Sequence, residues 1–329
     1  MQRARAMEAK GEARRLAQQD ADSFHSLFEA VFGHRCSASM YQWKYRDTPA
    51  QSYGFFDGGR LIAHCATFPR RMHAFGAPST AVQLADLMAL RHRAAGYLSG
   101  LARKSSPFFR TIDLLLSDLH QQPFPSIAFG FPSRRAMQLG ERLGVFTPID
   151  DLYELTIELR AHFSILYCNL RHHSISTCRG SLASVWRQMM ASFADYLICD
   201  RDPDSIAHRY FDHPLFRYRI IEIKHRLKGS TLGFFVLKEN DGSYEIADVI
   251  CHKKRLRACL EFASDYAHKE GGFPLKIWLT SAFADVADGL ASEKLLLELR
   301  IMASPRQKEP TLARMQGKWF LTSGDTDYR

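Results

Sequence analysis

The sequence lacks the features that define several common classes of protein. No apolar run approaches the roughly 18 residues that a helix needs to cross a bilayer, and the charged N-terminal stretch contains no apolar core of a secretion signal. The seven cysteines contain no Cys-x-x-Cys pair, and no histidines stand in His-x-x-x-His spacing beside a carboxylate. We therefore expect a cytoplasmic protein without a transmembrane helix, a disulfide framework or a metal site.

The chain also lacks a recognised motif for reading DNA or RNA, although it is basic. The net charge is +9, from 44 basic and 35 acidic residues, and such a surplus attracts polyanions. The basic residues are scattered, in pairs such as Arg70-Arg71 and Arg134-Arg135. With 46% hydrophobic and 24% charged residues, the 329-residue chain is typical of a two-domain globular protein that handles anionic small molecules, with no nucleic acid as partner.

The most informative segment is an apolar stretch that ends in a short basic turn. Residues 82–90 (VQLADLMAL) have strand character, residues 91–97 (RHRAAGY) include Gly96, and Leu98 and Leu101 follow at helical spacing. A strand that passes through a glycine-containing turn into a helix presents backbone N–H groups to an anion. The segment therefore predicts a phosphate-binding loop.

An ordered series of motifs resembles the GNAT (Gcn5-related) N-acetyltransferase superfamily, and in particular a bacterial subfamily of it. The spacing Arg93-x-x-Gly96 resembles the pyrophosphate loop of these proteins, whose ligand is acyl-coenzyme A. The other motifs that carry the resemblance are residues 28–33 (FEAVFG), 41–45 (YQWKY), 127–133 (IAFGFPS), 143–146 (LGVF) and 319–327 (WFLTSGDTD). The series extends over most of the chain.

The resemblance implies an α/β protein of two GNAT-like lobes, each a mixed, mostly antiparallel sheet flanked by helices. The second half repeats the first in weaker form, since residues 206–214 resemble residues 43–49 and Ala247-Asp248 resembles Ala85-Asp86. We expect residues 1–160 to form the lobe that binds acyl-CoA. Residues 161–329 would form a degenerate lobe that shapes the acceptor cleft or is structural, because its turn at residues 251–255 (CHKKR) contains no glycine.

Local patterns predict further elements. The Asp57-Gly-Gly59 turn predicts a hairpin, and Gly144 is expected to end a helix that begins near Ser133. We also expect a separate strand at residues 71–75, a continuation of the sheet at residues 111–116, and a helix through residues 293–299.

The resemblance assigns the cofactor, acetyl-CoA or another acyl-CoA, to the end of one strand and the following loop. Strand backbone would hold the thioester, and loop amides with the Arg93 charge would hold the pyrophosphate. Arg91 and His92 stand where the family usually has proline and tyrosine, and Leu98 stands where it has glycine or alanine. The full set of expected cofactor-binding residues is Met88, Ala89, Leu90, Arg91, His92, Arg93, Ala94, Ala95, Gly96, Tyr97 and Leu98.

Acyl transfer to an amine needs a base for the amine and an acid for the leaving thiolate. Asp86 is the best candidate for the base, because it lies on the same strand just before the loop; alternatively, it orients the neighbouring hairpin. Many relatives use a tyrosine as the acid at the position of Gly140. Its role would pass to another group, with His92, Ser133, Tyr97 and His64 as candidates, to solvent, or to no group.

Aromatic and acidic residues are expected to bind the acceptor. Trp43, Tyr45 and Phe131 would form one wall of its pocket, unless they belong to the core. Asp325 and Asp327 would bind its hydroxyls or amine at the cleft between the lobes, unless they form a solvated tail.

The resemblance thus implies an acetyl-CoA-dependent N-acyltransferase. Its acceptor would be a small-molecule amine, such as a nucleotide- or lipid-linked amino sugar of a surface-polysaccharide pathway. Two alternatives remain open, an aminoacyl or long-chain acyl transferase of the same fold and a catalytically inactive binding or scaffold protein. The sequence does not indicate the oligomeric state.

Overall fold

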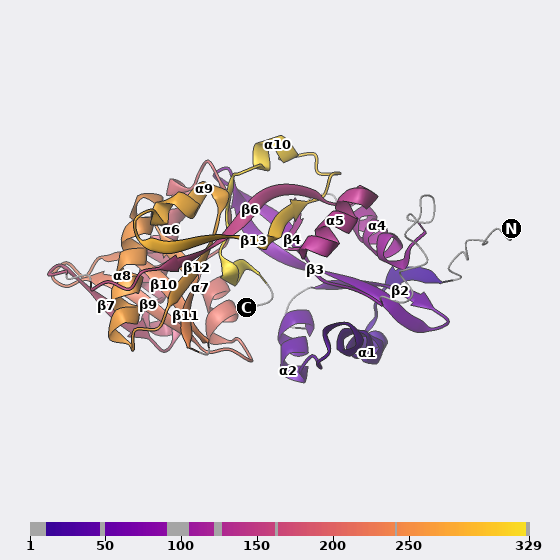
Figure 1. The fold of residues 1–329 in the computed structure, drawn as a ribbon, viewed down its shortest axis with the longest axis horizontal. Helices are drawn as coiled ribbons and strands as arrows, with labels where there is room; N and C mark the ends of the chain where they lie inside the picture. Colours follow the sequence, from indigo (N-terminus) through magenta and orange to yellow (C-terminus); the bar gives the residue numbers. More distant parts are fainter. Residues whose placement is uncertain are drawn as a thin grey trace. The chain divides into compact units, whose positions relative to one another are not determined.

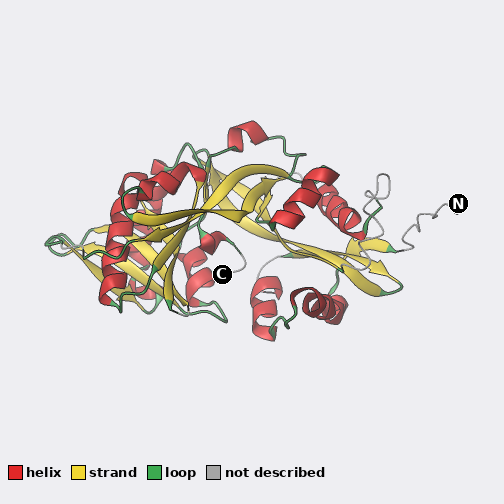
Figure 2. Ribbon diagram, viewed as in Figure 1, coloured by secondary structure: helices red, strands yellow, loops and turns green. Residues whose placement is uncertain are grey.

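The computed structural model describes residues 11–46, 50–90, 105–121, 127–161, 164–240 and 242–326. These residues form two compact units, each an α/β structure in which helices flank a mixed sheet (Figure 1, Figure 2), so the predicted fold class is confirmed. Unit 1 comprises Met1–Arg70, Thr80–Pro148 and Arg300–Leu312, and unit 2 comprises Arg71–Ser79, Ile149–Leu299 and Ala313–Arg329. The functional division after residue 160 stays a prediction.

Unit 1 is built on strands in the order β1-β2-β3-β4-β5, with the end of β13 beside β5. The pairs β1–β2 and β2–β3 are antiparallel, and β4–β5 is parallel. The elements are β1 (Glu12–Arg15), η1 (Gln18–Asp20), α1 (Ala21–Phe32), α2 (Ala38–Tyr41), η2 (Gln42–Arg46), β2 (Gln51–Asp57), β3 (Arg60–Ala74), β4 (Ala77–Ala89), α4 (Pro107–His120), β5 (Ile127–Gly130) and α5 (Arg134–Leu143).

Helices cover both faces of this sheet. Figure 1 shows α1 and α2 on one side of β2 and β3 and α4 and α5 on the other. Phe24 and Leu27 of α1 pack with Phe55, Leu61 and Met88 from the strands. The other face is covered by apolar residues of α4 and α5 that pack on the sheet, including Ile112, Leu115, Leu116, Leu119 and Met137. Burying these side chains supplies the main stabilisation of the unit.

Two predicted strand segments of the first half are wrong. Residues 111–116 lie in α4, because Ser106 caps the helix, Pro107 occupies its first turn, and the buried positions recur at helical spacing. Residues 71–74 are not a separate strand, since β3 runs without a break from Arg60 to Ala74. The hairpin at Asp57-Gly-Gly59 and the end of α5 at Gly144, whose φ is 69°, are confirmed.

Unit 2 has strands in the order β13-β6-β12-β11-β10-β9-β7, and β8 lies between β14 and the end of β3. Helices α6 and α8 pack on β10 and β11. The elements are β6 (Thr147–Ile157), β7 (Tyr167–His172), η5 (Ile175–Thr177), α6 (Arg179–Ser192), β8 (Leu197–Cys199), α7 (Pro203–Ile206), η6 (Ala207–Phe211), β9 (Tyr218–His225), β10 (Thr231–Asn240), β11 (Ser243–Cys251), η7 (Lys253–Arg255), α8 (Leu256–Lys269), β12 (Leu275–Thr280), α9 (Ser281–Ala284), η8 (Asp285–Ala287), β13 (Ala291–Ala303), α10 (Leu312–Met315), β14 (Trp319–Phe320) and η9 (Ser323–Asp325).

The predicted helix at residues 293–299 is wrong, because this segment lies in β13. Glu158 donates its backbone N–H to the Leu290 carbonyl at 2.8 Å, and Ser292 Oγ donates to the Thr156 carbonyl at 3.2 Å. Pairing with β6 therefore overrides the helical propensity of a segment rich in leucine and glutamate. None of the helices in the described part of the chain is long and apolar enough to span a membrane.

Candidate active site

Strand β4 parts from β5 in the middle of its length. The two strands are paired from Ala81↔Ile127 to Leu84↔Gly130, where β5 ends, whereas β4 continues to Ala89. Two residues beyond the last pair, Asp86 has a φ of 47°, a left-handed conformation that is uncommon outside glycine. The distortion of β4 thus coincides with the residue that the sequence singles out as a base.

Asp86 is held by two neighbouring side chains from the π-helical turn η2. Lys44 Nζ lies 2.8 Å from Asp86 Oδ1, and the Tyr45 hydroxyl donates a hydrogen bond to Oδ2. The carboxylate and the ammonium are both buried, with 8% of each residue exposed. Burial raises the pKa of Asp86, but the Lys44 charge and the hydrogen bonds from Lys44 and Tyr45 outweigh it, so the pKa lies below its usual value.

This arrangement favours a positioning role for Asp86 over a catalytic one. A general base works best with a pKa near the working pH, and the pKa of Asp86 is shifted in the opposite direction. Both of its oxygens already accept hydrogen bonds from Lys44 and Tyr45. The contacts agree with the alternative, that Asp86 orients its neighbours, and the role as base stays a prediction.

His64 of β3 lies beside this group and is only 1% exposed. Its Nδ1 is 2.9 Å from the Asp86 carbonyl, which can only accept, so Nδ1 carries the proton. Burial lowers the pKa of His64 to about 4, and the ring is therefore neutral at pH 7. Its Nε2 lone pair has no hydrogen-bond partner among the described residues. His64 is thus an acceptor at Nε2, which argues against its use as the missing acid.

The aromatic residues expected to contact the acceptor differ in their surroundings. The Tyr45 ring stacks on Tyr41 at a centroid distance of 5.0 Å, and both rings line a hollow of about 140 Å³ between η1 and η2. Trp43 lies half-buried in the same turn as Tyr45. Phe131 is 2% exposed and packs against Phe129, so its position matches the core alternative.

Two of the positions considered for the acid, Ser133 and Gly140, belong to α5 and its N-terminus. The Ser133 side chain is exposed and accepts a hydrogen bond from the Ala136 N–H at 3.5 Å, as an N-cap does. Gly140 is buried in the helix, and a Cβ atom added there would lie 2.0 Å from Phe146 Cδ2. A catalytic role for Ser133 stays a prediction, and its observed role is to cap the helix.

The expected cofactor residues at the end of β4 are partly committed to the fold. The Met88 side chain is fully buried in the core under α1. The Leu90 N–H donates to the Ile62 carbonyl at 3.0 Å, so this amide is not available to a thioester. Leu90 also lines a hollow of about 350 Å³ with polar groups of α1, among them Asp22, Ser23 and Ser26.

Several predicted site residues lie outside the described residues, and their roles stay predictions. They are Arg91, His92, Arg93, Ala94, Ala95, Gly96, Tyr97, Leu98 and Asp327. Within the described ranges, no group of histidine, cysteine, aspartate and glutamate side chains is arranged to hold a metal ion.

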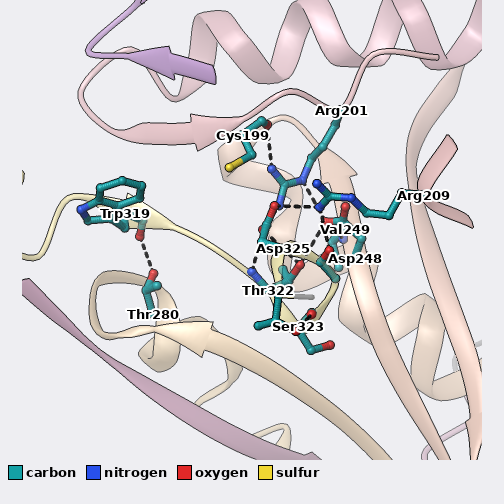
Figure 3. A network of polar contacts seen from close by, with 12 residues as sticks. Cys199, Arg201, Arg209, Asp248, Val249, Thr280, Trp319, Thr322, Ser323 and Asp325 are labelled. Atoms are coloured by element: carbon teal, nitrogen blue, oxygen red, sulfur yellow. Dashed lines mark hydrogen bonds and ion pairs between the residues drawn. The ribbon is translucent and has the colours of Figure 1, made fainter. Parts of the chain in front are cut away.

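Asp325 lies in unit 2 and is 1% exposed (Figure 3). Arg201 Nη2 lies 2.6 Å from its Oδ2, and Arg209 Nη1 lies 3.0 Å from its Oδ1. Burial raises the pKa of Asp325, but the two arginines outweigh this effect and keep it below its usual value. The chain's own arginines thus neutralise the carboxylate, and the expected role of Asp325 in binding substrate stays a prediction.

Sequence reasoning missed Lys44, Arg201 and Arg209. Lys44 precedes Tyr45, whose hydroxyl donates a hydrogen bond to Asp86. Arg209 likewise precedes Tyr210, whose hydroxyl donates a hydrogen bond to Asp248. The signal for both was a basic residue directly before a tyrosine, in two segments of similar sequence. Nothing in the sequence around Arg201 marks it as buried.

Comparison with known proteins supports the fold, and a family model matches part of the chain. Residues 12–107 match the model of the acetyltransferase (GNAT) domain. Comparison with curated protein sequences finds no match.

Solved structures resemble most of the chain. A conserved protein of unknown function from Enterococcus faecalis V583, described as a probable N-acyltransferase, aligns with a TM-score of 0.70 and 14% identity over 89% of this chain and 72% of that one. A GCN5-related N-acetyltransferase from Kribbella flavida aligns with a TM-score of 0.65 and 12% identity over 91% of this chain and 72% of that one. Saccharomyces cerevisiae N-myristoyltransferase with bound myristoyl-CoA aligns with a TM-score of 0.53 and 9% identity over 92% of this chain and 84% of that one. The resemblance to the GNAT superfamily is thereby confirmed: residues 12–107 match its acetyltransferase domain, and the chain has the GNAT fold.

Proposed function

We propose that this chain is an acyl-CoA-dependent N-acyltransferase that transfers an acyl group, in the first place acetyl, to a small-molecule amine. The observation that carries the proposal is the parting of β4 from β5 after Leu84↔Gly130, inside the segment that matches the GNAT domain. A strand that leaves its parallel neighbour exposes backbone groups along one edge, which a linear ligand can pair with.

The described end of β4 is compatible with an acyl-CoA at this place. The edge of β4 at Leu87–Ala89, beyond the Asp86 distortion, would hold the acyl arm, and residues 91–98 would hold the pyrophosphate. When bound, acyl-CoA would supply an activated thioester carbonyl. The Leu90 N–H would not contact the ligand, because it already donates to the Ile62 carbonyl.

The chain's own residues would position the acceptor. Asp86 fixes the Tyr45 hydroxyl and the Lys44 ammonium, and this holds the Tyr45 ring at the hollow that it lines with Tyr41. An aromatic wall of this kind suits the face of a sugar ring. Among substrate amines we propose an amino sugar of a surface-polysaccharide pathway, linked to a nucleotide or a lipid, and the net charge of +9 favours such an anionic carrier.

A long-chain acyl donor is the second candidate. The observation that favours it is the likeness in fold to an N-myristoyltransferase that holds myristoyl-CoA. Parallel assays with acetyl-, octanoyl- and myristoyl-CoA distinguish the two by the donor that gives the higher kcat/KM.

The proposal is tested by calorimetric titration of the whole chain with acetyl-CoA and with myristoyl-CoA. We expect micromolar binding that the charge reversal Arg93→Glu weakens at least tenfold, because Arg93 is expected to face the pyrophosphate. The matched control is Arg142→Glu, an exposed arginine at the end of α5, which should leave the affinity unchanged. Absence of binding at high micromolar concentrations of both ligands would support the scaffold alternative instead.

A further inference from the structure

Unit 2 contains a second copy of the Asp86 arrangement. Tyr210 of the π-helical turn η6 donates to Asp248 Oδ2 at 2.9 Å, just as Tyr45 of η2 donates to Asp86. Asp248 also lies at a distortion, since the register of β10 and β11 shifts between Val236 and Leu237. The parallel pairing of β11 with β12 stops at Ile246↔Ile277, two residues before Asp248, as that of β4 with β5 stops two residues before Asp86.

The place beyond this pairing is filled by residues 319–326 of the chain itself (Figure 3). Thr280, the last residue of β12, donates its hydroxyl to the Trp319 carbonyl. On the other side, a Cβ atom added to Gly324 would lie 2.7 Å from the Ala247 carbonyl oxygen of β11. Every residue from 319 to 326 is buried. The segment therefore lies against the end of β12 and the middle of β11.

Two arginines hold the segment in place: Arg201, which is buried, and Arg209, whose side chain is 13% exposed. Arg201 Nε lies 2.8 Å from Asp248 Oδ1, and its Nη2 lies 2.6 Å from Asp325 Oδ2, so that one guanidinium bridges strand and segment. Arg209 Nη1 donates to the Gly324 carbonyl at 2.7 Å. Ion pairs with this degree of burial hold their partners in one geometry, because separating them would leave charges unpaired in a medium of low dielectric constant.

The turn that follows β11 is closed to an anion as well. The Lys253 N–H donates to Ser192 Oγ at 2.9 Å, and the Lys254 N–H donates to His252 Nδ1 at 3.2 Å. The Arg255 N–H donates to the His252 carbonyl at 2.8 Å. The amides that would have to face a pyrophosphate at the start of α8 therefore already have acceptors within the protein.

From these independent observations we infer that unit 2 is a closed copy of the acyl-CoA site, in which the segment 319–326 takes the place of the acyl arm. The chain accordingly binds one acyl-CoA, in unit 1. The identity of the ligand in this inference rests on the proposed function. The closure of the site rests on the contacts within unit 2.

The stoichiometry of acyl-CoA binding tests the first part. Titration of the whole chain should give one site, which Arg93→Glu in unit 1 weakens and Lys254→Glu in unit 2 leaves unchanged. Two sites per chain, or a site that responds to Lys254→Glu and not to Arg93→Glu, would overturn the inference.

Hydrogen exchange of the ligand-free chain tests the closure itself, so it decides the matter even if acyl-CoA does not bind and the proposed function fails. The Asp325 and Thr326 N–H groups donate to the Thr322 and Ser323 carbonyls, each at 3.1 Å, inside a buried segment. We expect them to exchange about 1,000-fold more slowly than in an unstructured peptide. Exchange within about tenfold of the peptide rate would show that the segment 319–326 does not stay in place, and would refute the inference.

Discussion

Phe146 lies directly against Gly140 in unit 1, so that a Cβ atom added to the glycine would stand 2.0 Å from Phe146 Cδ2 and 2.5 Å from its Cγ. The resemblance to GNAT proteins places Gly140 where many relatives are expected to carry a tyrosine acid. In this chain the Phe146 ring fills that space and belongs to the core between α4 and α5. A side chain at position 140 would therefore require Phe146 to move.

We predict that Gly140→Ala destabilises the protein by about 1–3 kcal/mol, because Phe146 must move to admit the methyl group. The matched control is Gly180→Ala in α6, where nothing lies within 4 Å of the added Cβ and alanine favours the helix. That control should be neutral or stabilising by up to about 1 kcal/mol. Urea unfolding measures both, and equal effects of the two substitutions would contradict the packing argument.

Breaking the Lys44–Asp86 ion pair should lower the free energy of unfolding far more than breaking a surface ion pair. Asp86→Asn keeps a side chain that tolerates the φ of 47° but removes the charge that faces the buried Lys44 ammonium. We expect a loss of about 3–5 kcal/mol in the free energy of unfolding. The control Asp118→Asn breaks the pair with Arg15, whose side chain is 54% exposed, and should cost less than about 1 kcal/mol.

Two further measurements separate a positioning role of Asp86 from a catalytic one. The double substitution Lys44→Met/Asp86→Asn should recover part of the stability, because neither buried charge is then left alone. In an active preparation, a base would show as a loss of kcat and of the acidic limb of the pH–rate profile at unchanged stability. That pattern would contradict the positioning role.

His64 should make the protein less stable in mild acid. Burial lowers its pKa to about 4 in the folded chain, against an ordinary value of 6.5. Between these values the unfolded chain binds a proton and the folded chain does not, so the stability rises with pH across this window and falls as the pH drops from 6.5 to 4. The loss amounts to about 3 kcal/mol over the window.

This dependence is measured as the free energy of unfolding at pH 7 and at pH 4.5 in urea. His64→Gln should lose less stability between the two values than the unmodified chain, whereas His34→Gln, at an exposed position, should behave like the unmodified chain. An identical pH dependence in all three proteins would exclude His64 as its source.

Much of the fold could be predicted because local signals agreed with the tertiary structure. Gly144 adopts the left-handed conformation that ends α5, and the Asp57-Gly-Gly59 turn joins β2 and β3 as expected. The predictions for residues 111–116 and 293–299 were wrong for opposite reasons. A run of apolar residues is compatible with a strand or a buried helix, and the N-cap at Ser106 decides between them. The segment 293–299 has helix-forming residues, but its place beside β6 makes it a strand.

The candidate site was predictable only in part, because its roles depend on burial. The sequence indicates Asp86 and Tyr45, but not that Lys44 neutralises the carboxylate. In the same way, an aspartate near the C-terminal end suggests a solvated ligand-binding group, and only the fold reveals that Asp325 is enclosed by Arg201 and Arg209. Charge compensation between residues far apart in the chain leaves no local pattern.

Arg201 should be the residue on which the closure of unit 2 depends most. Its guanidinium bonds Asp248, Asp325 and the Cys199 carbonyl at once, and the residue is 1% exposed. A lysine keeps the charge but presents a single ammonium, which cannot reach both carboxylates in the planar fork geometry of arginine. We therefore expect Arg201→Lys to lower the free energy of unfolding by about 2–4 kcal/mol and to speed amide exchange in residues 322–326. The control Arg179→Lys alters an exposed pair with Asp204 and should change neither quantity measurably. If Arg201→Lys retained full stability and slow exchange, the closure of unit 2 would not depend on the Arg201 bridge.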